Sequence, residues 1–374
     1  MRILAIDIGT GTQDILLFDS SGPIENCVKM VMPSPTKIAE QRIRGATRAG
    51  RPVVLTGVTQ GGGPCHWALE DHIRAGNAAF ATPEAAQTFD DDLEQVARMG
   101  IRVVSGDEAP SIDGERVDLK DVDLPAVRAA LAAFDVSPQF DGLALACLDH
   151  GAAPPDYSDR LFRFDHLRRV VGDRNDLAAF AMLPDEIPDY LTRARTVVDT
   201  ARVQDGAGTP IVFLDTGPAA ALGALQDERV AASVSNGEPQ LVLNLGNMHA
   251  LAFHLHGTQI ISLYEHHTGE ITAAQIEDFT ERLIAGSLPH EDVFNSKGHG
   301  VFYADGAPST TANAPRPLVA VTGPQRAKIR GSRLDPYFAT PHGDMMISGC
   351  FGLLTAFAAK HPTAAEEIKA ALRS

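Results

Sequence analysis

The sequence predicts an α/β protein in which two similar hairpins face each other across a cleft. A strand, a glycine-rich turn and a returning strand occur twice, at residues 3–18 and 241–255. Strand and helix signals alternate between residues 52 and 104, which favours parallel strands covered by helices. A helix of small residues is predicted at 218–225, and a second half of the chain follows it.

Turn residues and hydrophobic patterns define the elements of the first half. Residues 2–8, 13–18 and 27–32 are predicted to form a meander of strands. A helix is expected at 36–49, ended by Gly50. Further strands are expected at 52–56, 78–81, 101–104 and 142–147, and further helices at 65–74, 83–99 and 124–134. We expect a surface loop or hairpin at 107–121 and irregular chain at 151–174.

The second half follows the same logic. A helix around residues 188–201 leads to a strand at 210–214 and then to the helix of small residues. Strands are expected at 240–245, 250–256, 259–264 and 318–321, and helices at 272–284 and from about 344 to 360. Residues 290–315 show no clear periodicity.

Both hairpin turns carry residue types that bind phosphate. The candidates are Asp7, Gly9, Thr10, Gly11 and Thr12 in the first turn and Asn244, Gly246 and Asn247 in the second. Glycine lets backbone N–H groups approach a phosphate, and hydroxyl groups add donors. A carboxylate at a strand end can hold a hydrated Mg²⁺ ion. Two such turns facing each other would hold a polyphosphate from both sides, although an ordinary hairpin explains the first turn alone equally well.

Three further segments are candidates for chemistry. Asp149 and His150 end a strand and offer a general base; the alternative is an aspartate that caps the next turn beside a packed histidine. Arg160 and Arg163 either bind an anionic substrate or lie exposed on a loop. Residues 61–64, Gly-Gly-Gly-Pro, either bind an anion at a helix start or form a tight turn, and no Lys-Ser or Lys-Thr follows to make a P-loop.

Histidines gather in the second half, at His249, His254, His256, His266, His267 and His299. Glu265 with His267 and His299 is a candidate metal site, because imidazole and carboxylate are good ligands. Hydrogen-bonded structural histidines are the alternative. The four cysteines lie far apart, so we expect no iron–sulfur cluster.

Charge and hydropathy limit the partners. The formal net charge of −16 would repel nucleic acid and anionic membranes, so we expect neither as a partner. No run of about 18 apolar residues is present to span a membrane. Met1 leads directly into a strand pattern without a secretion leader, and we therefore expect a cytoplasmic protein. A small-molecule substrate or a protein partner remains open.

Five segments in order resemble the actin-like ATPase superfamily, which includes actin, the DnaK-type chaperones and many sugar kinases. Residues 4–10 and 241–247 resemble its two phosphate motifs, 215–223 and 343–352 its connecting helices, and 319–324 its adenosine motif. The resemblance implies a two-lobed, duplicated ribonuclease H-like fold. Its first lobe would comprise residues 1–225, with a β/α insertion at about 51–135 and the C-terminal helix 344–374, and its second lobe residues 226–343.

The resemblance also implies that ATP or ADP binds with Mg²⁺ in the cleft. Asp7 would hold Mg²⁺ through water, Gly323 would approach the adenosine, and residues 272–284 would wall the adenine. Asp149 or Asp215 would orient the nucleophile.

Two positions depart from the superfamily pattern. The second phosphate motif usually begins with Asp, and here Asn244 stands there. The acidic residue usual at the start of the first connecting helix is Thr216, with Asp215 beside it. Nucleotide binding is therefore better supported than hydrolysis. The alternatives to an ATPase or small-molecule kinase are a nucleotide-gated scaffold protein with little turnover and a relative that has lost its nucleotide and binds a metal.

Within the superfamily, residues 61–64, 149–151 and 265–268 resemble a family of prokaryotic proteins labelled "putative pyruvate formate-lyase activating enzyme". A radical activase of that kind needs three clustered cysteines for its iron–sulfur centre, and this sequence has no such cluster. The sequence therefore does not predict that activity.

Overall fold

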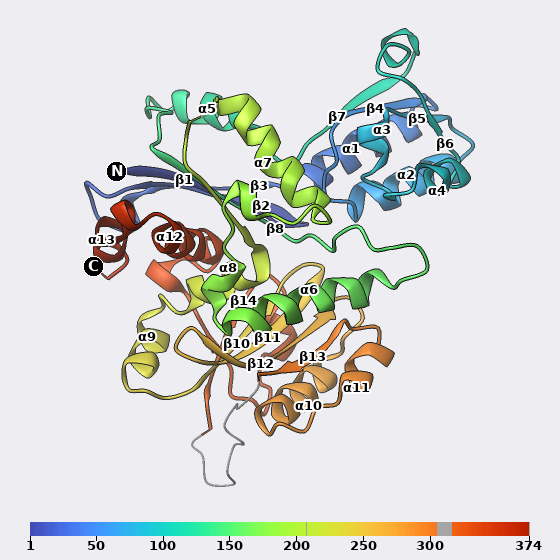
Figure 1. The fold of residues 1–374 in the computed structure, drawn as a ribbon. Coiled ribbons are helices and arrows are strands. Elements are labelled where there is room, and N and C mark those ends of the chain that lie inside the picture. Colours follow the sequence, from blue (N-terminus) through green and yellow to red (C-terminus); the bar gives the residue numbers. More distant parts are fainter. Residues whose placement is uncertain (207, 305–315, 374) are drawn as a thin grey trace.

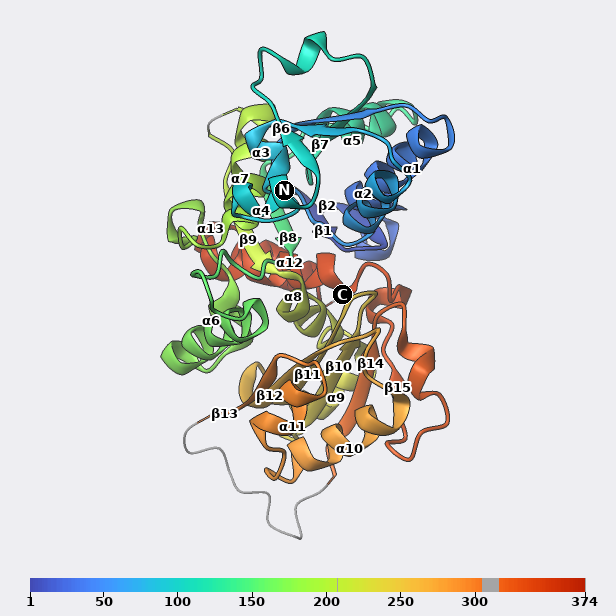
Figure 2. The same ribbon diagram turned by 90° about the vertical axis from the view of Figure 1, so that its right-hand side faces the viewer.

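The computed structural model describes residues 1–206, 208–304 and 316–373 and contains three β-sheets. Two sheets lie one above the other in Figure 1, with helices α8 (Thr216–Ala224) and α12 (Ser348–Lys360) between them. The third sheet lies beside the first, away from the second (Figures 1 and 2). The predicted α/β class is confirmed. No helix within the described residues is long and apolar enough to cross a membrane.

The first sheet has the strand order β3-β2-β1-β8-β9. Strands β1 to β3 form the predicted antiparallel meander, and β8 and β9 continue the sheet parallel to β1. Register pairs Ile8 with Cys147 and Cys147 with Asp215, so the carboxyl ends of the parallel strands meet at one edge. The strands are β1 (Arg2–Ile8), β2 (Thr12–Asp19), β3 (Val28–Pro33), β8 (Gly142–Cys147) and β9 (Ile211–Asp215).

The second sheet repeats this arrangement in the order β13-β12-β11-β10-β14-β15. Strands β10 to β13 form an antiparallel meander, and β14 and β15 run parallel to β10. The two similar hairpins of the sequence thus begin two sheets of similar topology. The strands are β10 (Gln240–Leu245), β11 (His249–His256), β12 (Gln259–His267), β13 (Gly300–Tyr303), β14 (Leu318–Thr322) and β15 (Tyr337–Phe338).

Helices cover the outer faces of both sheets. Apolar side chains of α5 (Leu124–Ala132) and α7 (Thr192–Asp205) pack on the first sheet, and those of α10 (Ala273–Ile284) and α11 (His290–Asn295) pack on the second. The inner faces share one core with α8 and α12. Helices α9 (Glu228–Ser235) and α13 (Pro362–Ala371) extend that core.

The third sheet is entirely parallel, with the order β6-β5-β4-β7. It confirms the parallel layer predicted from the alternation of strands and helices. One element differs, because residues 107–121 contain β7, which pairs with β4 where we expected a loop or hairpin. The elements are α1 (Pro35–Arg48), β4 (Val53–Gly57), α2 (Pro64–Arg74), β5 (Ala79–Ala81), α3 (Pro83–Ala86), α4 (Leu93–Arg98), β6 (Ile101–Val103) and β7 (Glu115–Leu119).

Two other expectations about local structure were wrong. The helix expected at 83–99 is split into α3 and α4. Residues 159–174, expected to be irregular, form α6 (Asp159–Arg174), which buries a face at helical spacing while charged residues dominate its composition. The stretch 290–315 contains α11 and β13 and otherwise falls partly outside the described residues.

Helices α8 and α12 touch through their backbones. A Cβ atom added to Gly223 would lie 1.7 Å from the carbonyl oxygen of Ser348, and one added to Gly352 would lie 1.9 Å from that of Ala219. Only glycine permits so close an approach. The crossing fixes the distance between the two sheets, and thus the width of the space at their facing edges.

We expect Gly223→Ala to lower the free energy of unfolding by roughly 1–3 kcal/mol, because the new methyl group forces the helices apart. Gly45→Ala in α1 is the matched control, since nothing lies within 4 Å of its Cβ position. Removing a helical glycine there should stabilise the protein by about 0.5–1 kcal/mol. Urea denaturation of both variants checks this, and an equal response of the two would contradict the close crossing.

Candidate nucleotide site and histidine cluster

The two hairpin turns have the same backbone geometry. In the first, the N–H of Gly9 donates to the carbonyl oxygen of Thr12 at 2.9 Å; in the second, the N–H of Gly246 donates to that of His249 at 3.0 Å. A Cβ atom on either glycine would lie 2.9 Å from the same acceptor oxygen. The sequence likeness therefore reflects one turn built twice, with Asp7 and Asn244 in equivalent positions two residues before each glycine.

Both turns line a single cavity between the two sheets. A Cβ atom added to Gly11 would lie 2.3 Å from Nδ2 of Asn247, so the tips of the turns meet. Eight of the nine residues that the sequence predicts to bind nucleotide line this cavity, and Gly11 lies beside them. The eight are Asp7, Gly9, Thr10, Thr12, Asn244, Gly246, Asn247 and Gly323.

Gly323 closes the cavity on the side of β14. Its φ angle is +95°, and a Cβ atom there would lie 2.4 Å from the carbonyl oxygen of Leu245. Pro324, Met345 and Met346 continue the wall beside it. Helix α10 (residues 273–284), expected to wall the adenine, contributes no residue to this cavity in the part of the chain that the structure describes.

Asp7 lies at the bottom of the cavity and is enclosed on two sides. The hydroxyl of Thr216 donates to its Oδ1 at 2.6 Å. A Cβ atom on Gly349 would lie 1.9 Å from its Oδ2, so α12 presents bare backbone to this carboxylate. Burial, with a smaller contribution from Asp215, raises the pKa of Asp7 to about 7. A cation at this carboxylate would remove that cost of burial.

Asp14 is a second carboxylate in the cavity and was not predicted from the sequence. It pairs with Asp7 across the β1–β2 hairpin, and its buried Oδ1 has no hydrogen-bond partner. Burial and the neighbouring Asp7 raise the pKa of Asp14 to about 8. The signal was present, because antiparallel pairing around a short turn places residue 14 opposite residue 7.

The three predicted catalytic residues lie behind the cavity wall, at the carboxyl ends of β8 and β9. The carboxylate of Asp149 accepts from the N–H groups of Gly151 at 2.8 Å and Ala194 at 2.9 Å, which is the capping arrangement considered as its alternative. Asp215 caps α8 through the N–H of Gly217 at 3.0 Å and forms an ion pair with Arg163. His150 contacts other histidines. A catalytic role for these residues stays a prediction.

Arg163 forms the centre of a buried ionic group. Its side chain is fully buried, and it pairs with Asp215 and, at 3.2 Å, with Oε2 of Glu265. It also donates to the carbonyl oxygen of Asp149 at 3.3 Å. Burial would raise the pKa of Glu265, but the Arg163 guanidinium outweighs it and holds this pKa well below its ordinary value. The expectation that Arg163 lies on a loop or binds substrate was therefore wrong.

Arg160, the other predicted anion ligand, is also engaged. Its guanidinium donates to the carbonyl oxygens of Phe294 at 3.0 Å and Gly298 at 2.6 Å and lies over the ring of Phe294. Arg193, which the sequence did not single out, lines the cavity and forms an ion pair with Asp121 at 2.7 Å. Among the described residues, it is the arginine that lines this cavity.

The glycine-rich loop before α2 packs against the same region. The N–H of Gly61 donates to the Asp121 carboxylate at 3.1 Å, so its donor is already used. Gly63, with a φ angle of +67°, precedes Pro64 at the start of the helix, and its Cβ position lies 3.5 Å from the methyl carbon of Thr10. The loop thus supports the first hairpin turn from behind.

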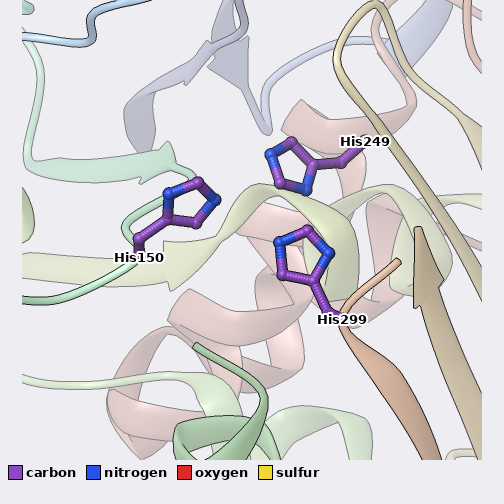
Figure 3. A group of neighbouring side chains, drawn as sticks. All are labelled: His150, His249 and His299. Atoms are coloured by element: carbon purple, nitrogen blue, oxygen red, sulfur yellow. The ribbon is translucent and has the colours of Figure 1, made fainter. Parts of the chain in front are cut away.

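Four histidines group at the edge of the cavity. The ring centroid of His249 lies 5.1 Å from that of His150, 5.0 Å from that of His299 and 4.9 Å from that of His267. Figure 3 shows His150, His249 and His299 with their rings turned towards a common space. Burial lowers the pKa of His299 to about 2 and that of His150 well below its ordinary value. His267 and His299, predicted as metal ligands with Glu265, do lie together.

Three solved structures are weakly similar to this one. The first is a protein from Listeria monocytogenes titled "a putative N-acetylmannosamine kinase", with 10% identity, coverage of 96% of this chain and 99% of that one, and a TM-score of 0.33. A ROK hexokinase from Thermus thermophilus has 13% identity, 70% and 48% coverage and a TM-score of 0.23. An exopolyphosphatase from Cytophaga hutchinsonii has 11% identity, 86% and 66% coverage and a TM-score of 0.27. Superpositions this loose carry no inference about chemistry.

No curated protein matches the chain. The model of one protein family, by contrast, matches residues 60–328, which is most of the length of this chain. The match begins at the glycine-rich loop and ends beyond the turn of Gly323. The chain belongs to the family described as "Putative pyruvate format-lyase activating enzyme (DUF1786)".

Proposed function

We propose that the protein binds ATP or ADP with Mg²⁺ in the cavity between the first and second sheets. In this proposal the two sheets are the cores of two lobes of an actin-like fold. The first lobe comprises residues 1–225 and the C-terminal helices from residue 344, and the second comprises residues 226–343. The third sheet is the insertion in the first lobe.

The observation that carries the proposal is the repeated turn geometry. Two turns with the same Gly N–H to carbonyl bond face each other at the tips of β1–β2 and β10–β11, and both line one cavity. The N–H of each of these glycines is used within its own turn, but the lack of a side chain there would let an anion approach other N–H groups of the turn. A pair of such turns suits a chain of phosphates, and the Gly323 turn lines the same cavity.

The carboxylates of the cavity fit a magnesium ion. Asp7 and Asp14 are buried side by side with raised pKa values, and one oxygen of Asp14 has no partner. Mg²⁺ prefers carboxylate oxygens and retains several waters. When bound, the ion would neutralise phosphate charge. Asp7 and Asp14 would hold it from the first lobe, while Asn244, with no charge, would hydrogen-bond from the second.

The activity that we propose is that of an ATPase or small-molecule kinase. Arg193 lines the cavity, and its positive charge would stabilise negative charge that develops on a phosphate during transfer. Asp149 and Asp215 would act from behind the wall by fixing the loop of His150 and the guanidinium of Arg163. Both roles are those of positioning residues.

Asn244 supports a second candidate, a nucleotide-gated scaffold with little turnover. It occupies the position equivalent to Asp7 but brings no charge to hold a metal or orient water. Phosphate release from ATP separates the two candidates. A rate far below about 1 s⁻¹, with ATP binding intact, favours the scaffold.

Asp7→Ala is expected to weaken binding of Mg²⁺–ATP by more than about 10-fold, because the carboxylate at the base of the cavity is lost. Asp19→Ala is the matched control, since Asp19 ends the same hairpin at its exposed end and bonds to Ser21. Isothermal titration of both variants with ATP and Mg²⁺ measures the difference. Unchanged affinity in Asp7→Ala would overturn the proposed site.

A further inference from the structure

Three histidines converge from three separate parts of the chain. His150 follows β8, His249 begins β11, and His299 precedes β13. One nitrogen from each ring lies within 4.8 Å of the other two (Figure 3). Ligands of a tetrahedral zinc ion lie about 3.4 Å apart at Zn–N distances of about 2.0–2.1 Å, so small ring rotations bring these nitrogens onto one ion.

The histidine nitrogens are buried without partners. Nε2 of His150 and both ring nitrogens of His299 have no hydrogen-bond partner among the described residues. A buried polar atom without a partner is costly, and buried polar groups in native proteins are almost always satisfied. Three such nitrogens in one small space indicate a ligand that binds lone pairs.

His249 is held in the orientation that ligation requires. Its Nδ1 lies 2.9 Å from Oε1 of Glu265, a carboxylate, and therefore carries the proton and donates. In the neutral form of the ring, this hydrogen bond leaves the lone pair of Nε2 available to a metal ion. A carboxylate that holds the far nitrogen of a histidine in this way is the usual companion of metal-bound imidazole. Glu265 is in turn fixed by Arg163 at 3.2 Å.

His299 is fixed by its backbone. Its N–H donates to the carbonyl oxygen of Glu265 at 2.9 Å. The glycines on either side are tightly enclosed, since a Cβ atom on Gly298 would lie 2.5 Å from the ring of His266, and one on Gly300 would lie 2.3 Å from the ring of His290. The backbone on both sides of His299 is therefore closely packed.

The surrounding charge favours a cation. The buried ionic group combines one guanidinium, Arg163, with two carboxylates, Asp215 and Glu265, and it lies beside the imidazole of His249. The group carries an excess of negative charge where no solvent compensates it. A divalent ion held by the histidines would supply that compensation.

We propose that His150, His249 and His299 bind one divalent transition-metal ion, with Zn²⁺ the best match to three imidazoles, and leave one coordination position open towards the cleft. Three histidines with an open position are the ligand set of a catalytic rather than a structural zinc site. His249 also lines the nucleotide cavity, so the open position faces the space next to the second hairpin turn. The inference does not depend on nucleotide binding.

Titration with Co²⁺ and Zn²⁺ tests this site. The full chain is first treated with a chelator, then titrated with Co²⁺ while visible absorption is recorded, and Zn²⁺ is added to displace it. We expect one equivalent to bind with the strong absorption of four-coordinate Co²⁺. The weak absorption of octahedral Co²⁺, or no binding of either ion, would overturn the proposal.

Variants locate the ion. His299→Ala and His150→Ala are expected to lose more than about 100-fold in Zn²⁺ affinity, and Glu265→Gln about 10- to 100-fold. His256→Ala is the matched control, because His256 lies exposed at the far end of the strand that His249 begins. Retained affinity in both ligand variants would place the ion elsewhere and contradict the proposal. Circular dichroism checks that each variant folds, and if one does not, the wild-type spectrum and the other variant decide.

Discussion

Replacing Arg163 by methionine is expected to lower the free energy of unfolding by about 3–5 kcal/mol. Methionine fills much of the space of the arginine but carries no charge. Asp215 and Glu265 would remain buried without the guanidinium that both contact. Removing one partner of a buried ionic group costs far more than the group contributes to stability when intact. Urea denaturation measures the loss.

The control is Arg174→Met, at the exposed last turn of the same helix α6. A surface change of this kind is expected to shift stability by no more than about 0.5 kcal/mol. Adding Asp215→Asn and Glu265→Gln to Arg163→Met should recover part of the loss, because the stranded charges are then removed. Asp215 belongs to the first sheet and Glu265 to the second, and Arg163 contacts both. If Arg163→Met lowers the free energy of unfolding by less than about 1 kcal/mol, this ionic group does not hold the two sheets together.

Asp14→Asn is expected to stabilise the metal-free protein, and more so as pH rises. The pKa of Asp14 is raised from 3.8 to about 8 in the folded protein. Folded protein therefore holds a proton that unfolded chain releases between these pH values, so wild-type stability falls as pH rises through this window. Each pKa unit corresponds to about 1.4 kcal/mol. We expect the free energy of unfolding of Asp14→Asn to exceed that of wild type by roughly 2–4 kcal/mol at pH 8 and by about 1 kcal/mol at pH 5. The gain is smaller than the full pKa shift would give, because the neighbouring Asp7 titrates together with Asp14.

Denaturation in the presence of a chelator at the two pH values measures this gain. Asp19→Asn is the control, since hydrogen bonds from Ser21 lower the pKa of Asp19 and its neutral variant should lose stability instead. Mg²⁺ should stabilise wild-type protein and narrow its difference from Asp14→Asn. If the gain in free energy of unfolding is the same at pH 5 and pH 8, Asp14 is ionised in the folded protein at both pH values. Burial would then not raise its pKa.

Much of the fold could be predicted because its signals are local. Glycine turns between apolar strands mark both hairpins, and their spacing identifies the meanders of the first and second sheets. Regular alternation likewise predicted the parallel third sheet. Helix α6 was missed because five arginines give it a polar composition. Its buried face includes Arg163, and the sequence offers no reason to place an arginine inside the protein.

The site was predictable in its two hairpin turns and in the turn at Gly323. Asp7, Gly9, Gly246 and Asn247 are recognised by local pattern and line the cavity. The histidine cluster depends on how three distant segments meet. His150 was predicted as a base and His299 as a ligand of another metal set, since no local pattern connects residues 50 or more positions apart. Sheet pairing brings β11 and β12 together, and with them His249 and Glu265.

Nucleotide binding by the facing hairpin turns can be measured directly by isothermal titration. The wild-type, metal-defined protein is titrated with ATP and with ADP, each with and without Mg²⁺. We expect binding at micromolar concentrations, equivalent to about −8 kcal/mol, that strengthens when Mg²⁺ is present. If the folded protein gives heat signals no larger than those of dilution for both nucleotides, the hairpin turns do not bind a nucleotide. The histidine cluster would then be left as the site of function.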